Sequence, residues 1–356
     1  MTSTGTRLAD LTTLRVGGPA ARLVVAHDSD ELLAAVKDVD ARGERLLLVA
    51  GGSNLVVADA GFDGTVVHVA RPVDGGILLQ GADYCGGADM TVQAGAVWDE
   101  LVALAVAQGC SGLEALSGIP GSVGATPVQN VGAYGSEVSD TVATVQLYDR
   151  SEQRVRTLAA RDLQFGYRDS LLKRAGADGP GGTDRYVVLR VGFQLPVADR
   201  SAPVRYAELA RALGVEVGQR AKLAQVREAV LTLRAGKGMV LDDADADTWS
   251  VGSFFTNPVL PESGLAPSLA GAPRWPAGDG RVKLPAAWLI EQAGIVKGHG
   301  MPGPAAVSTK HTLALTNRGG ARAEDVVRLA REVRDAVEGA FGVTLEAEPR
   351  LVGLTL

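Results

Sequence analysis

Two uncharged, glycine-rich segments of this sequence have the composition of ligand-binding loops. The first, AGGSN at 50–54, lies between the apolar runs 46–49 and 55–57, and the second, at 117–135, contains five glycines and two prolines. Glycine disfavours regular helix and strand, and proline lacks an amide donor, so such segments fold as loops. Backbone amides at such bends can bind a diphosphate without a lysine. One turn of this kind would more often be a hairpin or crossover loop, and only the two together favour a ligand site.

The composition argues against several classes of protein. With 356 residues, 46% of them hydrophobic, the chain has material for two or three domains. Its net charge is −6, with Lys and Arg scattered along the chain, which argues against a nucleic-acid surface. Cys85 and Cys110 lack a CxxC spacing and are expected to be reduced thiols. The sequence has no signal-peptide core and no apolar run of about 18 residues, so we expect a cytoplasmic protein without membrane insertion.

Motifs for common cofactors are missing from the sequence. There is no Walker A run, and the G-x-G-x-x-G at 298–303 follows an expected helix instead of a strand and contains a proline where the next helix would begin. A flavin or nicotinamide would therefore be bound by a fold other than Rossmann. We expect no metal site, because the histidines are widely separated. They are His27, His68, His299 and His311.

Apolar periodicity predicts alternating strands and amphipathic helices, as in an α/β protein. Helices are expected at 30–43, 98–108, 225–234, 285–293 and 323–341. Strands are expected at 46–49, 55–57, 65–69, 77–80, 90–94, 142–148, 154–157, 186–195 and 344–348. The glycine-rich stretch 175–183 is expected to be a surface loop, and the aspartate-rich stretch 242–247 a solvated loop.

Six motifs, taken in order, resemble the UDP-N-acetylenolpyruvoylglucosamine reductase family. They are AGGSNL at 50–55, GIPGSVG at 118–124, QNVGAYG at 129–135, YRDS at 167–170, GSFFTNP at 252–258 and AVSTKH at 306–311. The resemblance extends from Thr12 to Gly353, nearly the whole chain. PVRY at 203–206 and the length of chain between Ser170 and Gly252 resemble the longer subtype, which has an extra tyrosine-bearing loop over the substrate.

The resemblance implies an α/β (α+β) fold of the vanillyl-alcohol-oxidase type, with two FAD-binding α/β subdomains and a third, substrate-covering domain. The implied domains are 1–70 with 343–356, then 71–236, then 237–342. The implied activity is an NADPH-dependent, FAD-mediated reduction of UDP-N-acetylglucosamine enolpyruvate to UDP-N-acetylmuramate, a peptidoglycan precursor of the bacterial cell wall. We expect a monomer whose partners are the UDP-sugar enolpyruvate and NADPH.

Three residues match the catalytic residues of the family. Reducing an enolpyruvyl ether needs a hydride at the β carbon, a proton at the α carbon and a partner for the charge that develops on the carboxylate. Arg168 suits the carboxylate because a guanidinium stays protonated and binds bidentately. The alternative is a structural ion pair with Asp169 or a neighbouring loop. Ser253 matches the proton donor, although a serine there would otherwise satisfy a turn. Glu348 matches the acid near the C-terminus, and as an acid it would need a raised pKa.

The resemblance also implies residues that bind cofactor and substrate. FAD is expected on Gly51, Gly52, Ser53, Asn54, Leu55, Ile119, Gly121, Ser122, Gly124 and Ala133. The sugar nucleotide is expected on Tyr134, Tyr206, Lys237, Asn257, Trp275, His311 and Arg350. Trp275 stands where relatives often carry tyrosine, so an indole replaces a hydroxyl contact. His311 by itself would more often be structural, and Pro349, a departure from many relatives, fits only an edge position or a strand end.

Two functions from other classes stay open at this point. One is an FAD oxidase or dehydrogenase that acts on an alcohol or sugar with the same fold. The other is a sugar-nucleotide-binding regulatory protein without catalysis, against which the presence of Ser253 and Glu348 argues. Oxygen consumption without a response to NADPH would favour the first, and a colourless purified protein would favour the second.

Overall fold

The computed structural model describes residues 2–3, 5–83 and 85–356, which form two compact units. The first unit contains Ala20–Gly51, Asp63–Gly236 and the start of the chain through Thr6. The second contains Arg7–Pro19, Gly52–Phe62 and Lys237–Leu356. The three-domain division made from the sequence stays a prediction, and it shares with these units a boundary between residues 236 and 237.

The first unit contains a four-stranded sheet in the order β1-β2-β5-β3, in which β3 and β5 are parallel. Helix α1 packs on this sheet through Leu32, Val36 and Val39, because its apolar positions recur at helical spacing. Asp28 caps the helix by accepting the amides of its first turn. The elements are β1 Thr2–Ser3, β2 Ala20–Ala26, α1 Ser29–Ala41, β3 Leu46–Val49 and β5 Phe62–Val69.

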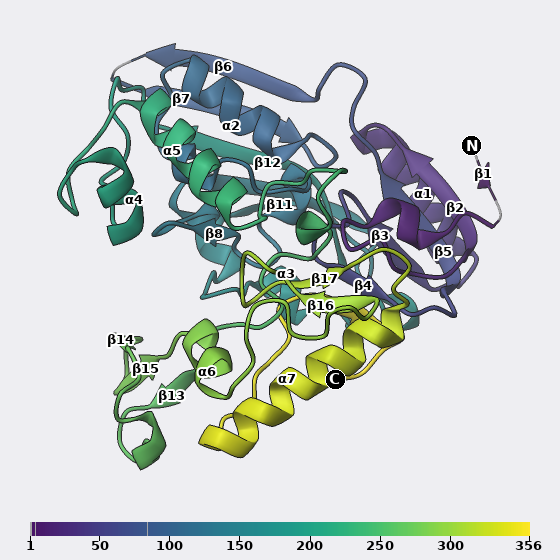
Figure 1. Ribbon diagram of the computed structural model, residues 1–356. Helices are drawn as coiled ribbons and strands as arrows, with labels where there is room; N and C mark the ends of the chain where they lie inside the picture. Colours follow the sequence, from purple (N-terminus) through teal and green to yellow (C-terminus); the bar gives the residue numbers. More distant parts are fainter. Residues whose placement is uncertain (1, 4, 84) are drawn as a thin grey trace. The chain divides into compact units, whose positions relative to one another are not determined.

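A five-stranded antiparallel sheet in the order β11-β10-β12-β7-β6 forms the rest of the first unit's framework. Its strands are β6 Ile77–Asp83, β7 Gly87–Gln93, β10 Val142–Asp149, β11 Arg154–Ala159 and β12 Tyr186–Leu195. Helix α2, Trp98–Ala107, packs on the sheet, and the rings of Trp98 and Phe193 lie 6.1 Å apart in its core. Helix α5, Leu223–Gly236, lies beside α2 (Figure 1).

Shorter elements complete the first unit. Helix α4 packs on α5 through a small cluster that includes Val204, Leu209 and Val230. The shorter elements are β8 Gly132–Ala133, β9 Ser136–Glu137, α3 Leu171–Arg174 and α4 Ala207–Leu213. The short 3-10 turn η2, Glu114–Leu116, precedes the glycine-rich loop at 117–135, and η3, Val123–Ala125, lies within it.

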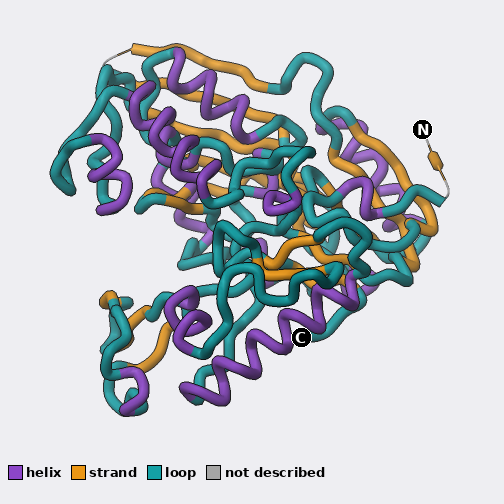
Figure 2. Tube along the Cα trace, viewed as in Figure 1, coloured by secondary structure: helices purple, strands orange, loops and turns teal. Residues whose placement is uncertain are grey.

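The second unit is built around helix α7, Ala323–Phe341, whose buried stripe includes Val326, Val333 and Val337. This helix packs along the hairpin of β16, Ala305–Val307, and β17, Leu315–Asn317 (Figure 1). Figure 2 shows loop segments around these two short strands. Strand β4, Leu55–Val57, pairs in parallel with β18, Arg350–Val352. A three-stranded sheet contains β13 Val259–Pro261, β15 Arg281–Lys283 and β14 Trp275–Pro276. The remaining helix is α6, Ala286–Gln292.

The five expected helices are confirmed, with ends within two residues of those predicted. The expected strand at 344–348 is wrong, because the last strand is β18 and the 344–348 segment makes only an isolated bridge, between Ala347 and Phe255. Pro349 lies directly before β18, at the strand end that its missing amide requires. The hairpin alternative for the 50–54 turn is also wrong, since β3 and β4 belong to different sheets.

Candidate functional site

The GIPGSVG loop of the first unit is held in place by backbone hydrogen bonds to the segment before α2. The Trp98 amide donates to the Gly121 carbonyl at 3.0 Å, and the Val123 amide donates to the Ala96 carbonyl at 2.8 Å. A further bond joins the Gly124 amide to the Ala94 carbonyl at 2.9 Å. The loop therefore runs along residues 94–98, joined to them by these bonds and by an isolated bridge between Val97 and Ser122, and it has no charged side chain.

The two glycine-rich loops predicted from the sequence meet in the first unit. A Cβ on Gly51 would lie 2.7 Å from the Gly121 Cα, so the Gly121 backbone leaves no room for a side chain at position 51. Gly52, which belongs to the second unit, has a φ of +59°, and a Cβ there would lie 1.9 Å from the Leu11 carbonyl oxygen. The Ser122 hydroxyl is buried and has no hydrogen-bond partner among the described residues. A buried polar atom in this position is available to a ligand, so these loops fit a bound cofactor.

Asp99 fixes the beginning of the same loop. Its carboxylate accepts the Gly118 amide at 2.6 Å and forms two bonds of 2.7 Å with the Arg227 guanidinium of α5. Burial alone would raise the pKa of Asp99, but the hydrogen bonds from Arg227 and Gly118 and the charge of Arg227 lower the pKa below its ordinary value. The carboxylate is thus held ionised between a helix and the glycine-rich loop.

Arg168 contacts the QNVGAYG loop. Its guanidinium donates to the Gly132 carbonyl at 2.7 Å and to the Asn130 carbonyl at 3.4 Å. Arg168 has a φ of +54° and Asn130 a φ of +48°, conformations that are rare outside glycine and that cluster at functional sites. The carboxylate of Asp169 pairs with Arg174. The expected alternative for Arg168, a structural ion pair with Asp169 or a neighbouring loop, stays a prediction.

Two tyrosines predicted to bind substrate lie together in the first unit. The rings of Tyr134 and Tyr206 meet edge to face with centroids 5.6 Å apart. Burial, with smaller contributions from Glu208 and Tyr206, raises the pKa of Tyr134 to about 12 against the opposing charge of Arg234. Because Tyr206 is 45% exposed, the 203–206 loop carries an aromatic side chain to solvent beside the half-buried Tyr134.

Ser253 and Glu348 belong to two segments that pair in the second unit. The Glu348 amide donates to the Phe254 carbonyl at 2.8 Å, and the Phe254 amide donates to the Leu313 carbonyl at 2.8 Å. The Asn54 side chain donates to the Glu348 carbonyl at 3.4 Å. The turn beside Ser253 is satisfied by Ser250, whose hydroxyl accepts the amide of residue 252. The structure thus brings together Ser253, Glu348 and the Asn54 turn, while Arg168 belongs to the other unit.

The remaining predicted substrate residues are spread over the second unit. The Asn257 side-chain oxygen accepts the Ala286 amide at 2.9 Å and so caps α6. Trp275 is 50% exposed on β14 and pairs with Lys283 of β15. Lys237 follows α5, Arg350 opens β18, and His311 lies in the loop between β16 and β17.

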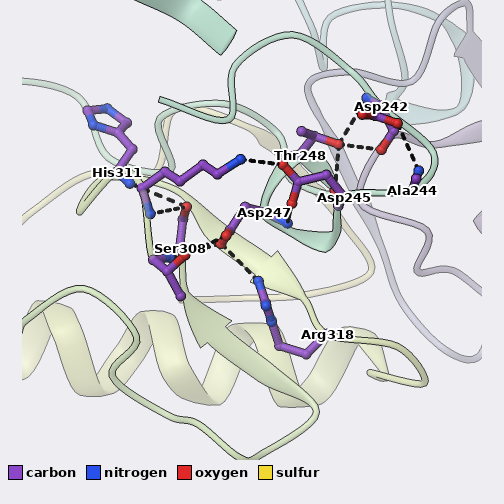
Figure 3. Close-up of polar contacts among 10 residues, drawn as sticks. Asp242, Ala244, Asp245, Asp247, Thr248, Ser308, His311 and Arg318 are labelled. Atoms are coloured by element: carbon purple, nitrogen blue, oxygen red, sulfur yellow. Dashed lines mark hydrogen bonds and ion pairs between the residues drawn. The ribbon is translucent and has the colours of Figure 1, made fainter. Parts of the chain in front are cut away.

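A functional cluster that the sequence analysis missed surrounds Asp247. This side chain, expected in a solvated loop, is buried, and only the first part of the 242–247 stretch is exposed. Its carboxylate accepts the Thr309 amide at 2.8 Å and hydroxyl at 2.5 Å, and it pairs with Arg318 at 2.8 Å (Figure 3). The Lys310 ammonium pairs with Asp245 at 2.5 Å. No local pattern distinguishes Asp247 from its neighbours, since its partners lie 62 and 71 residues away.

Residues 2–3, 5–83 and 85–356 contain no group of three or more His, Cys, Asp or Glu side chains placed to hold a metal. None of the helices described there is both long and apolar enough to cross a bilayer.

Comparison with known proteins gives the class first. A family model described as an FAD binding domain matches residues 20–158. A crystal structure of UDP-N-acetylenolpyruvylglucosamine reductase from Thermus caldophilus aligns with 99% of this chain and 100% of its own, with a TM-score of 0.64 and 26% identity. The fold and its paired glycine loops therefore define a flavoprotein of the vanillyl-alcohol-oxidase type, as the sequence predicted.

The family follows from the C-terminal half and from full-length relatives. The model of the UDP-N-acetylenolpyruvoylglucosamine reductase C-terminal domain matches residues 243–352. The reductase of Salinispora arenicola is 55% identical, covering 98% of this chain and 95% of its own length, and that of Saccharopolyspora erythraea is 55% identical over 99% and 96%. The chain belongs to the UDP-N-acetylenolpyruvoylglucosamine reductase family and is an FAD-containing oxidoreductase.

Proposed function

We propose that this enzyme reduces UDP-N-acetylglucosamine enolpyruvate to UDP-N-acetylmuramate, with NADPH as reductant, in the synthesis of peptidoglycan precursors. The observation that carries the proposal is the backbone pairing of the Ser253 and Glu348 segments, because it gathers a hydroxyl and a carboxyl of the family's catalytic set in one unit. Family membership favours this reduction over the oxidation of an alcohol or sugar.

The cofactor is FAD, held by the two glycine-rich loops. The residues that hold it are Gly51, Gly52, Ser53, Asn54, Leu55, Ile119, Gly121, Ser122, Gly124 and Ala133. Bound there, FAD would supply the hydride chemistry that links NADPH to the β carbon of the enolpyruvyl group. The buried Ser122 hydroxyl and the close approach of Gly51 to Gly121 support this assignment.

The chain's own residues complete the addition across the double bond. Ser253 gives its hydroxyl proton to the α carbon, which becomes the stereocentre of the product. Arg168 binds the substrate carboxylate and stabilises the charge that develops on it before protonation. Glu348, in its protonated form, supports the same charge. An alcohol is a weak acid, so Ser253 depends on such neighbours.

Seven residues are assigned to binding of the sugar nucleotide. They are Tyr134, Tyr206, Lys237, Asn257, Trp275, His311 and Arg350. The edge-to-face pair of Tyr134 and Tyr206 supports a role for the 203–206 loop in covering the substrate. We further propose that the enzyme is a cytoplasmic monomer with domains 1–70 with 343–356, 71–236 and 237–342.

The Ser253→Ala variant tests the proton-donor role. Flavin reduction by NADPH should stay within about twofold of wild type, while reoxidation by the enolpyruvyl substrate should slow by about 10² to 10⁴, the usual contribution of a general acid. Both half-reactions are followed by anaerobic stopped-flow absorbance of the flavin. Thr256→Val, three residues along the same segment, is the matched control. Equal slowing of both half-reactions would contradict the assignment.

A further inference from the structure

Asp247 binds a residue at the start of the connection between β16 and β17 and the residue that follows β17. The connection begins at Ser308, directly after β16, and Arg318 directly follows β17. The Asp247 carboxylate accepts the amide and hydroxyl of Thr309 at 2.8 and 2.5 Å, and it accepts Arg318 at 2.8 Å. Its side chain is 7% exposed and that of Arg318 is 21% exposed. Charge-assisted bonds in such a shielded place hold their partners firmly.

Each residue before His311 in this connection is anchored separately. The buried Ser308 hydroxyl accepts the amides of Lys310 at 3.0 Å and His311 at 3.3 Å, and the Lys310 ammonium pairs with Asp245 at 2.5 Å. Asp245 also accepts the Asp247 amide at 2.9 Å, so the two carboxylates are held as one group. Figure 3 shows the His311 ring turned away from the cluster that its backbone joins.

We propose that Asp247 is a positioning residue for substrate binding: it locks the turn at 308–311, and thereby fixes where the His311 imidazole meets the sugar nucleotide. The inference rests on the proposed function, which gives His311 that contact. Asp247 itself touches neither substrate nor cofactor in this account. Its effect passes through the Thr309 amide and the Ser308 hydroxyl to the backbone of His311.

The ionisation of Asp247 and Asp245 agrees with a turn that is held in place at the pH at which the enzyme works. Burial alone would raise the pKa of Asp247, but hydrogen bonds from Thr309 and Ser308 and the charge of Arg318 lower the pKa below its ordinary value. The pKa of Asp245 is lowered by its hydrogen bond from Lys310. Both carboxylates are ionised near neutral pH, so their bonds to the turn are present whenever the enzyme works.

The first experiment asks whether Asp247 holds the turn, and it needs no activity. Amide hydrogen exchange is measured on the holoenzyme of the wild type and of Asp247→Asn, Thr309→Val and Asp243→Asn. Exchange at residues 309–311 should accelerate at least about tenfold in the first two variants and stay unchanged in Asp243→Asn, whose side chain is 89% exposed. Unchanged exchange in both Asp247→Asn and Thr309→Val would overturn the proposal.

The second experiment asks whether the turn held by Asp247 affects substrate binding through His311. The dissociation constant of UDP-N-acetylmuramate for the oxidised holoenzyme is measured by calorimetry for Thr309→Val, His311→Ala and the double variant. Thr309→Val should weaken binding about 10-fold or more, since small misplacements of a positioned group are costly, and the double variant should bind no more weakly than His311→Ala. Fully additive losses would overturn the proposal, as would normal affinity in Thr309→Val.

The two experiments separate the inference from the function on which it rests. If the wild type binds no UDP-sugar, the proposed function fails and the binding role of Asp247 fails with it, while hydrogen exchange still decides whether Asp247 orders the turn. Thr309→Val removes one hydrogen bond to the turn and keeps both charges of the Asp247–Arg318 pair. It can therefore replace Asp247→Asn if that variant is too unstable to purify.

Discussion

Asp99 in the first unit and Asp247 in the second hold loops in the same way but differ in their access to water. Each carboxylate accepts a loop amide and pairs with an arginine: Gly118 and Arg227 for Asp99, Thr309 and Arg318 for Asp247. The Asp99 side chain is 33% exposed and that of Asp247 is 7% exposed. Removing one partner of a buried pair strands the other charge, whereas water can solvate the partner of an exposed pair. Loss of the carboxylate should therefore reduce the unfolding free energy more for Asp247 than for Asp99.

The largest effect is expected from Asp247→Ala. The substitution leaves Arg318 and the Thr309 amide without their shared acceptor, so the unfolding free energy should fall by about 3–5 kcal/mol. Urea unfolding of the holoenzyme, followed by circular dichroism, measures the loss. A loss below about 1 kcal/mol would mean that water or another side chain replaces the carboxylate, and the contrast between the two aspartates would disappear.

A smaller stability loss, with a specific consequence for the flavin, is expected from Asp99→Ala. We expect about 1–3 kcal/mol, because Arg227 can turn to solvent while the Gly118 amide loses its acceptor. The 117–124 loop should loosen, and flavin should dissociate faster, which gel filtration and the flavin-to-protein absorbance ratio report. Asp89→Ala, at an exposed position on β7, is the matched control. Flavin retention equal to that of the control would contradict the proposed link between Asp99 and the cofactor loop.

Acidification should weaken the hydrogen bonds and ion pairs made by Asp99 and Asp247. The pKa values of Asp99 and Asp247 are lowered in the folded protein, so each group adds stability above its ordinary pKa of about 3.9, and this stability is lost as the pH falls through the lowered value. The stability difference between wild type and Asp247→Asn should therefore narrow below about pH 4. Urea unfolding at a series of pH values tests this, and a difference independent of pH would contradict it.

The smallest effect is expected from Asp243→Asn. The Asp243 carboxylate pairs with Arg15 at 2.5 Å but is 89% exposed, and such surface pairs contribute little. The unfolding free energy should change by less than about 0.5 kcal/mol. A loss comparable to that of Asp247→Ala would show that the 242–247 segment is held as a whole and that burial does not separate its aspartates.

Much of the fold could be predicted because its signals are local. Helix α7 keeps apolar residues on one face over its whole length, and its predicted bounds equal those observed. The strand expected at 344–348 looked equally regular, yet it pairs with the 254–256 segment through an isolated bridge, between Ala347 and Phe255. A strand needs a neighbour as well as a pattern, and the neighbour is fixed by the tertiary fold.

The candidate site likewise combines residues that sequence motifs identify with contacts that only the tertiary fold determines. Ser253 and Glu348 were identified from motifs, and the pairing of their segments is a fact of the structure that periodicity could not give. Asp247 was missed because an aspartate-rich stretch normally favours solvent, and only its distant partners bury it. Arg168 was identified by its motif, whereas its left-handed backbone lies in a tight turn that is closed by backbone hydrogen bonds between Gly166 and Asp169.

The most direct test of the whole account is one anaerobic mixing experiment. The purified enzyme is reduced with one equivalent of NADPH and then mixed with UDP-N-acetylglucosamine enolpyruvate while the flavin absorbance near 450 nm is recorded. The account predicts that the oxidised spectrum returns without oxygen and that one equivalent of UDP-N-acetylmuramate forms. A flavin that stays reduced until air is admitted would contradict it.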